Sequence, residues 1–353
     1  MIPVDVRASI ALAAAFAVGC DLPTDLPVVE TRWIVPTEET RFGVNELLPG
    51  DVSLSADSSA FIVDFDPAAF SATLGSLCAA CALADGATVP KPPFLASLSS
   101  QIDFPPEVSA VSVLGGQVVF ELRNGLNFDP IRPGGAMFGS LTLTLTDDDD
   151  GDVVASLVIE GTDTGFAAGS TLTRALVLNA TDVNGSLTAD VVVNSPLGDA
   201  VTVRASDALS VTATPVNVRV SGVTIDVANR SVNLDPVSLD LTDVDQDIED
   251  RVVSGSLTVD VTNPFGIGAA LQISIAGPTI STIQKSAPVT ALPASTVVIA
   301  FTSDELKSIL GADVVLSGGA VVDPGAGSIT VSPGMELVLA ASLDLTLRLG
   351  GGN

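Results

Sequence analysis

The sequence predicts an all-β protein of tandem antiparallel β-sandwiches (Ig-like), preceded by a small N-terminal region with a short helix. From about residue 106 onward, short segments rich in Val, Thr, Leu and Ile alternate with turns rich in Gly, Asn, Asp and Pro. In residues 141–146 three leucines share one face of the expected strand and three threonines share the other. This period of two residues is typical of strands with one buried face.

The β region also repeats itself. GQVVFELRNGLNFDP (116–130) parallels GSLTVDVTNPFGIGA (255–269): each has a glycine, an alternating strand and an asparagine followed by Gly or Pro. DAVTVRASDALSVTATPVNVRV (199–220) parallels GSITVSPGMELVLAASLDLTLRL (327–349). These matched landmarks predict two sandwiches, over residues 106–235 and 236–353, each of a size common for one domain.

The N-terminus contains a short apolar run over residues 8–18, much shorter than the roughly 20 residues that a membrane-spanning helix needs. The run leads into Ala17-Val18-Gly19-Cys20, which resembles the lipobox of bacterial lipoproteins, although Ala17 stands where Leu is usual. The resemblance implies that residues 1–19 are a signal peptide and that Cys20 carries a lipid that anchors the protein in the bacterial cell envelope, on its periplasmic side or at the cell surface. Plain secretory cleavage and a buried core helix are the alternatives.

Residues 20–42 are rich in proline and acidic residues, and we expect them to form a tether between lipid and body. The small N-terminal region then covers residues 43–105 and includes an alanine-rich, helical stretch, SLCAACAL. If Cys20 carries lipid, Cys78 and Cys81 remain as a pair, which fits one disulfide in an oxidising compartment. A redox or metal-binding role is the alternative for this C-x-x-C spacing.

Charge and composition exclude several classes of function. The chain has 42 acidic and 14 basic residues, a net charge of −28, and this field opposes binding to nucleic acid. It has no histidine, which removes the usual general base and every His-ligated metal centre. Ser-Lys or paired-carboxylate chemistry remains possible in principle, but no catalytic motif accompanies the three lysines, and we expect no enzyme activity.

Two acidic clusters are the only candidate metal sites, with Ca²⁺ as the possible ligand because it prefers several carboxylate or carbonyl oxygens on one turned loop. Neither cluster matches an EF-hand loop; in the second, Ile248 stands where that loop needs glycine. The alternatives are a solvated hairpin tip for the first cluster and a linker between the repeats for the second. The candidate ligands are Asp147, Asp148, Asp149, Asp150 and Asp152 in the first cluster and Asp243, Asp245 and Asp247 in the second.

The segment SLTVDVTNPFGIGAALQISIAG, with the later strand ASTVVIAFT, resembles the late-embryogenesis-abundant type 2, or water-stress-hypersensitivity, domain over residues 252–350. The resemblance implies a non-catalytic β-sandwich with no catalytic residues to transfer. We expect Asn263 to satisfy backbone groups in a bend and Pro264 to end the strand ladder.

Together these observations predict a non-catalytic, envelope-tethered binding or structural module. Its expected partners are the membrane, through the lipid at Cys20, and an unknown envelope protein or apolar ligand. The high mean hydropathy leaves an apolar-ligand or lipid-binding transport protein as the alternative, which would need a continuous apolar cavity. A Ca²⁺-binding adhesion-type module is the second alternative.

Overall fold

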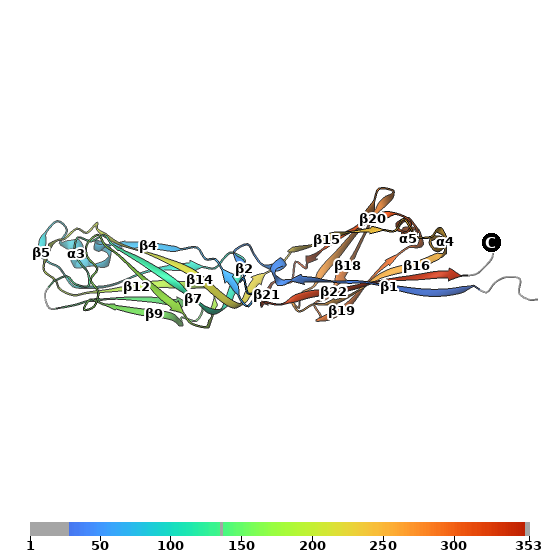
Figure 1. Ribbon diagram of the computed structural model, residues 1–353. Coiled ribbons are helices and arrows are strands. Elements are labelled where there is room, and N and C mark those ends of the chain that lie inside the picture. Colours follow the sequence, from blue (N-terminus) through green and yellow to red (C-terminus); the bar gives the residue numbers. More distant parts are fainter. Residues whose placement is uncertain (1–27, 135–136, 350–353) are drawn as a thin grey trace, which may run out of the picture.

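The computed structural model describes residues 28–134 and 137–349 and shows two β-sandwiches arranged end to end (Figure 1). The all-β prediction is confirmed, and the helices are short. No helix in the described part of the chain is long and apolar enough to cross a membrane.

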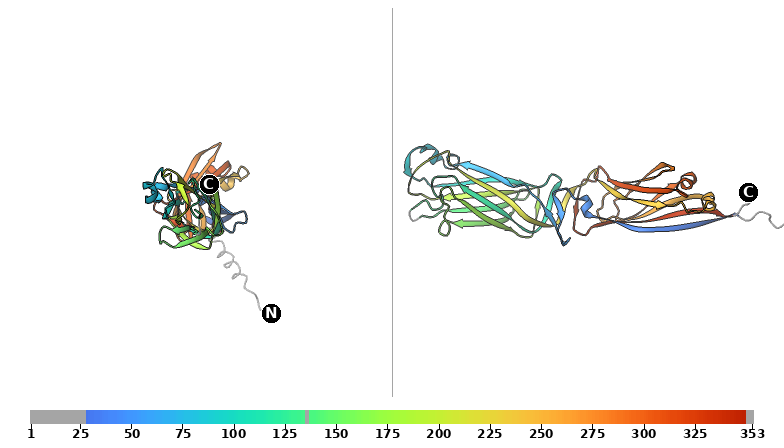
Figure 2. Two further views of the ribbon diagram at one scale, coloured as in Figure 1. Left: turned by 90° about the vertical axis from the view of Figure 1, so that its left-hand side faces the viewer. Right: turned by 45° about the horizontal axis from the view of Figure 1, so that its top comes forward.

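The first sandwich consists of two facing layers (Figure 2, right): a four-stranded sheet, and four long strands of an eight-stranded sheet to which shorter strands add. One layer has the order β4-β14-β7-β10 and the other the order β6-β12-β8-β9, with all neighbours antiparallel. The strands are β4 (Ala68–Thr73), β6 (Phe94–Asp103), β7 (Val108–Asn124), β8 (Ser140–Asp147), β9 (Val153–Glu160), β10 (Thr171–Leu178), β12 (Ser186–Ser195) and β14 (Ala208–Asp226).

The second sandwich has the same two layers. Its first sheet has the order β1-β22-β16-β19 and its second the order β15-β20-β17-β18, again antiparallel throughout. The strands are β1 (Val29–Gly43), β15 (Ser231–Asp240), β16 (Val252–Thr262), β17 (Ala269–Gly277), β18 (Ile280–Val289), β19 (Ala294–Phe301), β20 (Asp313–Val322) and β22 (Glu336–Leu349).

The two sandwiches share one topology. Numbered along the chain within each sandwich, the first, eighth, third and sixth strands form one sheet, and the second, seventh, fourth and fifth form the other. This is the strand order of a jelly roll. The predicted Ig-like order differs, because it places the first, second, fifth and fourth strands in one sheet. The predicted repeat is present, since β7 corresponds to β16 and β14 to β22.

The expected tether over residues 20–42 is wrong for its second half. Residues 29–43 form β1, which pairs with β22 along its whole length, from Val29 opposite Leu349 to Gly43 opposite Glu336. The first strand of the second sandwich therefore precedes the entire first sandwich in the chain. The first domain is inserted between the first and second strands of the second domain, so the predicted domain 236–353 lacks its first strand.

The expected separate region 43–105 is also wrong, because its strands belong to the first sandwich. β4 and β6 are strands of its two layers, and a short hairpin adds to the sheet next to β14. The remaining elements are η1 (Val44–Leu47), β2 (Val52–Leu54), β3 (Phe61–Val63), α2 (Leu74–Leu77), α3 (Ala79–Leu83), β5 (Thr88–Pro90), β11 (Thr181–Asn184), β13 (Ala200–Thr202), α4 (Gln246–Arg251), α5 (Ser303–Ile309) and β21 (Ser328–Val331).

Apolar side chains on alternate positions form the cores. In β8, Leu141, Leu143 and Leu145 are fully buried, whereas the threonines between them are only half-buried, as the alternation predicts. In β22 the apolar residues from Leu337 to Leu343 are only half-buried. The second core is therefore less completely closed than the first.

At the junction, a strand of one domain pairs with a strand of the other, and side chains from both domains pack in one core. β21, which lies between β20 and β22, pairs with β14 of the first sandwich, and Val331 in β21 is fully buried in the first core. Arg230, just before β15, donates to the Leu47 carbonyl oxygen and forms an ion pair with Glu107. These contacts join the two sandwiches at several points of the chain.

Candidate functional site

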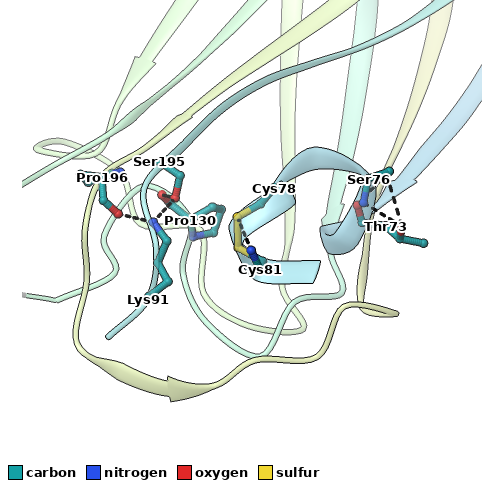
Figure 3. Close-up of a disulfide and its surroundings, with 8 residues drawn as sticks. All are labelled: Thr73, Ser76, Cys78, Cys81, Lys91, Pro130, Ser195 and Pro196. Atoms are coloured by element: carbon teal, nitrogen blue, oxygen red, sulfur yellow. Dashed lines mark hydrogen bonds between the residues drawn. A yellow bond between two sulfur atoms is a disulfide. The ribbon is translucent and has the colours of Figure 1, made fainter. Parts of the chain in front are cut away.

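The predicted disulfide between Cys78 and Cys81 is present, and both residues are buried. It links the end of α2 to α3 in the helical segment between β4 and β5 (Figure 3). Thr73 caps α2 by accepting a hydrogen bond from the Ser76 amide. The disulfide is part of the core at the end of the first sandwich that lies farthest from the second domain, which favours a structural role over a redox one. Cys20 lies outside the described residues.

A fully buried lysine lies near the disulfide, and the sequence analysis did not anticipate it (Figure 3). The Lys91 ammonium donates to the Ser195 hydroxyl at 2.6 Å and to the Pro196 carbonyl oxygen. It also lies over the rings of Phe94 and Phe128, 5.1 and 5.8 Å from their centroids. Burial lowers the pKa of Lys91 to about 8, because the charged form loses its hydration.

An amine of lowered pKa beside a serine hydroxyl is the pair that Ser-Lys hydrolases use. Here, however, Ser195 donates its own hydrogen bond to the Pro130 carbonyl oxygen, and both Lys91 and Ser195 are inaccessible to solvent. A substrate carbonyl has no path to this hydroxyl. The pair therefore serves to connect three loops at the end of the first sandwich.

The first acidic cluster lies at the β8–β9 hairpin, as predicted, with Gly151 at a φ of 77° in the turn. Asp147 differs from the expected solvated tip because it is buried; its carboxylate accepts hydrogen bonds from the Asp149 and Asn184 amides. Partial desolvation, the largest single effect, raises the pKa of Asp148, but the hydrogen bonds that its carboxylate accepts from Ser186, Thr188 and Gln101 together lower this pKa below its usual value. The two carboxylates bind the hairpin to β12 and its neighbours.

The second acidic cluster follows β15 within the second domain, so it is not the expected linker between repeats. Asp245 caps α4 by accepting a hydrogen bond from the Asp247 amide. In the described residues, no group of three or more Asp, Glu, Cys or His side chains is arranged to hold a metal ion. The hydrogen bonds that Asp147, Asp148 and Asp245 accept give these carboxylates local structural roles.

An apolar cavity of about 70 Å³ lies between the sheets of the second domain, at its junction with the first. Phe42, Leu47, Phe265 and Leu337 are among its walls. Ligand pockets for drug-sized molecules usually measure about 300–1,000 Å³, so this cavity is too small for a lipid. This cavity therefore does not supply the continuous apolar space that a lipid carrier requires.

A larger, polar groove of about 660 Å³ crosses the outer face of the sheet β15-β20-β17-β18. In β17 the apolar residues Leu271, Ile273 and Ile275 face the core, so Gln272 and Ser274 face outward into the groove. The volume lies in the usual range for small-molecule and cofactor sites. We call this feature the sheet groove.

Neighbouring strands continue the polar pattern in register. Gln272 lies opposite Gly319 of β20 and Ser286 of β18, and Ser274 lies opposite Ser317 and Gln284. The neutral hydrogen-bonding side chains that line the sheet groove are Asn233, Gln272, Ser274, Gln284, Ser286 and Ser317.

Among the described side chains that line the sheet groove, Lys285 alone is charged. It occupies a core-facing position, opposite Ile273, and its ammonium pairs with Glu305 at 2.8 Å and lies over the Phe301 ring. The Glu305 carboxylate also accepts from the Thr302 amide in a capping box, and its pKa is lowered, chiefly by the hydrogen bond from Lys285. The charge of Lys285 is thus already neutralised beneath the groove.

Two polar features were not among the sites predicted from the sequence: the Lys91–Ser195 contact and the sheet groove. The contact between Lys91 and Ser195 joins residues far apart in the chain, and its only sequence signal is a rare lysine between prolines. The sheet groove has a clearer signal. Glutamine and serine alternate with apolar residues in LQISIAG, which indicates a polar outer face on that strand.

Comparison with known proteins identifies no family. No family model matches the chain. No curated protein matches it either.

Three solved structures resemble the chain weakly. A protein of Parabacteroides distasonis thought to be secreted is 10% identical at a TM-score of 0.33, with 89% of this chain and 99% of that chain covered. The VP2 subviral particle of infectious bursal disease virus is 10% identical at 0.22, covering 97% and 77%. Peptide N-glycanase F is 11% identical at 0.18, covering 73% and 93%. At these TM-scores the likeness carries no argument about this chain.

Proposed function

We propose that this protein is a non-catalytic lipoprotein of the bacterial envelope that displays its two jelly rolls as a binding or structural module. The observation that carries the proposal is the position of the two ends of the described chain. Val29 pairs with Leu349 at the end of the second sandwich that faces away from the first (Figure 1). Cys20 precedes Val29 by only nine residues.

A lipid at Cys20 would therefore hold the second domain next to the membrane and the first domain away from it. Nine residues span at most about 30 Å, so the proposed anchor restricts how far the body can move from the bilayer. The net charge of −28 opposes direct adsorption to anionic headgroups, and a covalent lipid provides attachment that the protein surface does not.

The structural role of the Lys91–Ser195 pair supports the non-catalytic part of the proposal. The resemblance to late-embryogenesis-abundant type 2 domains agrees with it, since Asn263 donates to the Ile267 and Thr290 carbonyl oxygens as a purely structural residue.

Metabolic labelling with a palmitate analogue, followed by mass spectrometry of the native N-terminus, tests the anchor. We expect label on the full chain in the membrane fraction and an acylated N-terminal residue at Cys20. The variant Cys20→Ala should lose the label and leave the membrane fraction. The proposal would be overturned if the wild-type protein had an N-terminus without an acyl chain, or if its N-terminus lay at a residue other than Cys20.

A further inference from the structure

We propose that the sheet groove binds a neutral glycan chain laid across the four strands β15, β20, β17 and β18. This inference rests on the proposed role as a binding module and names the ligand class of that module. It does not depend on the lipid anchor, because the groove is formed entirely by described residues of the second domain.

The lining restricts the ligand by its charge. An anion would require arginine or lysine side chains in the groove, and a cation would require carboxylates. Lys285 is directed toward the core and paired with Glu305, and the described side chains that line the groove include no carboxylate. In a protein with a net charge of −28, a groove whose described lining has no unpaired charge fits an uncharged ligand.

The lining also restricts the ligand by its hydrogen bonding. Each glutamine or asparagine amide offers two donors and one carbonyl acceptor, and each serine hydroxyl both donates and accepts. Gln272, Gln284 and Asn233 are exposed and stand on three different strands. A ligand that presents many hydroxyl groups, each able to donate and accept, matches this pattern, whereas an apolar ligand would leave these amides unpaired.

The position of the groove distinguishes a glycan from a peptide. An extended peptide usually binds by adding a strand to a sheet edge, where backbone groups are free. The sheet groove crosses all four strands of its sheet, and the backbones of β17 and β20 are paired on both sides. The groove therefore presents side chains to a ligand. It does not present the free backbone N–H and C=O groups with which an added peptide strand would pair.

Gly319 lines the groove, and the close approach of the adjacent strand explains why a glycine stands there. A Cβ atom on Gly319 would lie 2.7 Å from the Val232 carbonyl oxygen of the adjacent strand. The absence of a side chain there also leaves room between Gln272 and Asn233, since both residues lie opposite Gly319 in register. A ligand can thus reach across the centre of the sheet.

Isothermal titration calorimetry on the full chain carrying Cys20→Ser tests the inference in solution. The probes are cellohexaose, maltohexaose and chitohexaose, with hexagalacturonate as the anionic comparison and a neutral Gly/Ser/Asn peptide of similar length. We expect saturable binding of at least one neutral hexasaccharide. The double variant Gln272→Ala/Gln284→Ala should weaken it by about tenfold or more, since each lost hydrogen bond costs about two- to tenfold in affinity.

The matched control is Gln246→Ala, which removes an exposed glutamine amide from α4, outside the groove. It should leave the affinity unchanged, and all variants should retain the wild-type melting temperature. The inference is overturned if none of the neutral hexasaccharides binds at about 10 mM, if the double variant binds as the wild type does, or if hexagalacturonate or the peptide binds more tightly. None of these results depends on acylation of Cys20, so they are distinguishable from failure of the proposed anchor.

Discussion

Two asparagines at equivalent positions hold the same bend in both domains. Asn124, at the end of β7, donates to the Phe128 and Phe166 carbonyl oxygens and accepts from the Leu126 amide. Asn263, just after β16, makes the corresponding three bonds to Ile267, Thr290 and Phe265. Both side chains are buried, and each amide satisfies three backbone groups around the bend.

Replacing either asparagine by alanine should destabilise its own domain by about 2–4 kcal/mol, because buried backbone groups lose their partners. Asn→Asp should be about as harmful, since a carboxylate does not donate to two carbonyl oxygens. Urea unfolding measures the loss. The control Asn45→Ala removes an amide whose contact is the exposed Glu46 and should change stability by less than about 0.5 kcal/mol. Equal effects of the three alanine substitutions would contradict this role.

Lys91 makes the stability of the first domain depend on pH. Its folded pKa of about 8 lies below the usual 10.5, so the unfolded chain binds more protons between these values and stability rises as pH increases through this window. At neutral pH the charged lysine costs about 3 kcal/mol relative to an unperturbed one. Unfolding measured at pH 7.5 and pH 10 should show the rise in the wild type and lose it in Lys91→Met. The same pH slope in both proteins would argue against a charged, buried Lys91.

At the scale of single elements, β1 shows why part of the fold escaped sequence analysis. It is an edge strand with exposed charges, and Pro36 interrupts it where the register with β22 shifts between Pro36 and Glu39. Its ion pair between Arg32 and Asp344 faces solvent, and edge strands of this kind lack the alternation of buried strands. The proline and the charged residues of this segment led to the prediction of a tether from the sequence.

Limited trypsin digestion distinguishes a strand from a tether. If residues 29–43 form β1, the bonds after Arg32 and Arg41 should be cut slowly, because the paired backbone does not enter a protease site. The exposed Arg204, in the loop between β13 and β14, serves as an internal reference and should be cut first. Mass spectrometry of early fragments reports the order. Rapid cleavage after Arg32 would contradict the strand and support a flexible tether.

The segment α2–α3 tests the role of the disulfide. Cys78→Ala/Cys81→Ala should lower the stability of the first domain by about 2 kcal/mol, because a link across three residues closes only a short loop. The folded structure should persist, since alanine fits where the small, buried cysteines lie. Chemical denaturation of the variant measures this. Complete loss of folding would show that the disulfide does more than constrain the unfolded chain.

For the whole molecule, local patterns predicted the fold class, the repeat, the disulfide and the hairpin at residues 147–152. They failed where the outcome depended on contacts across the chain. Strand alternation in LQISIAG does not reveal that Gln272 lies opposite Ser286, and Ser274 opposite Gln284, on the adjacent strand. Nothing near Val29 shows that it pairs with Leu349. The insertion of one domain into the other depends on which strands pair with each other, and the pattern within a single strand does not specify its partner.

The insertion predicts an asymmetry between the two domains. A fragment of residues 44–230 should fold alone, because it contains all eight strands of the first jelly roll. A fragment of residues 231–353 should remain largely unfolded, because it lacks β1 and exposes the edge of β22. Circular dichroism and amide spectra measure both, and a peptide of residues 28–43 should restore the second. A stable, monomeric 231–353 fragment would show that β1 is dispensable.

The course of β1 also determines how the molecule would respond to mechanical load. This one strand leads from the N-terminal side to the first domain along the whole length of the second. If force were applied between the N-terminus and the first domain, tension would run along β1, parallel to its hydrogen-bonded partner β22. Because β1 is already extended and its covalent chain is continuous between these two points, its backbone would carry the tension directly. The rest of the second domain would lie beside the load path, so it would stay folded instead of unfolding in series with the first domain.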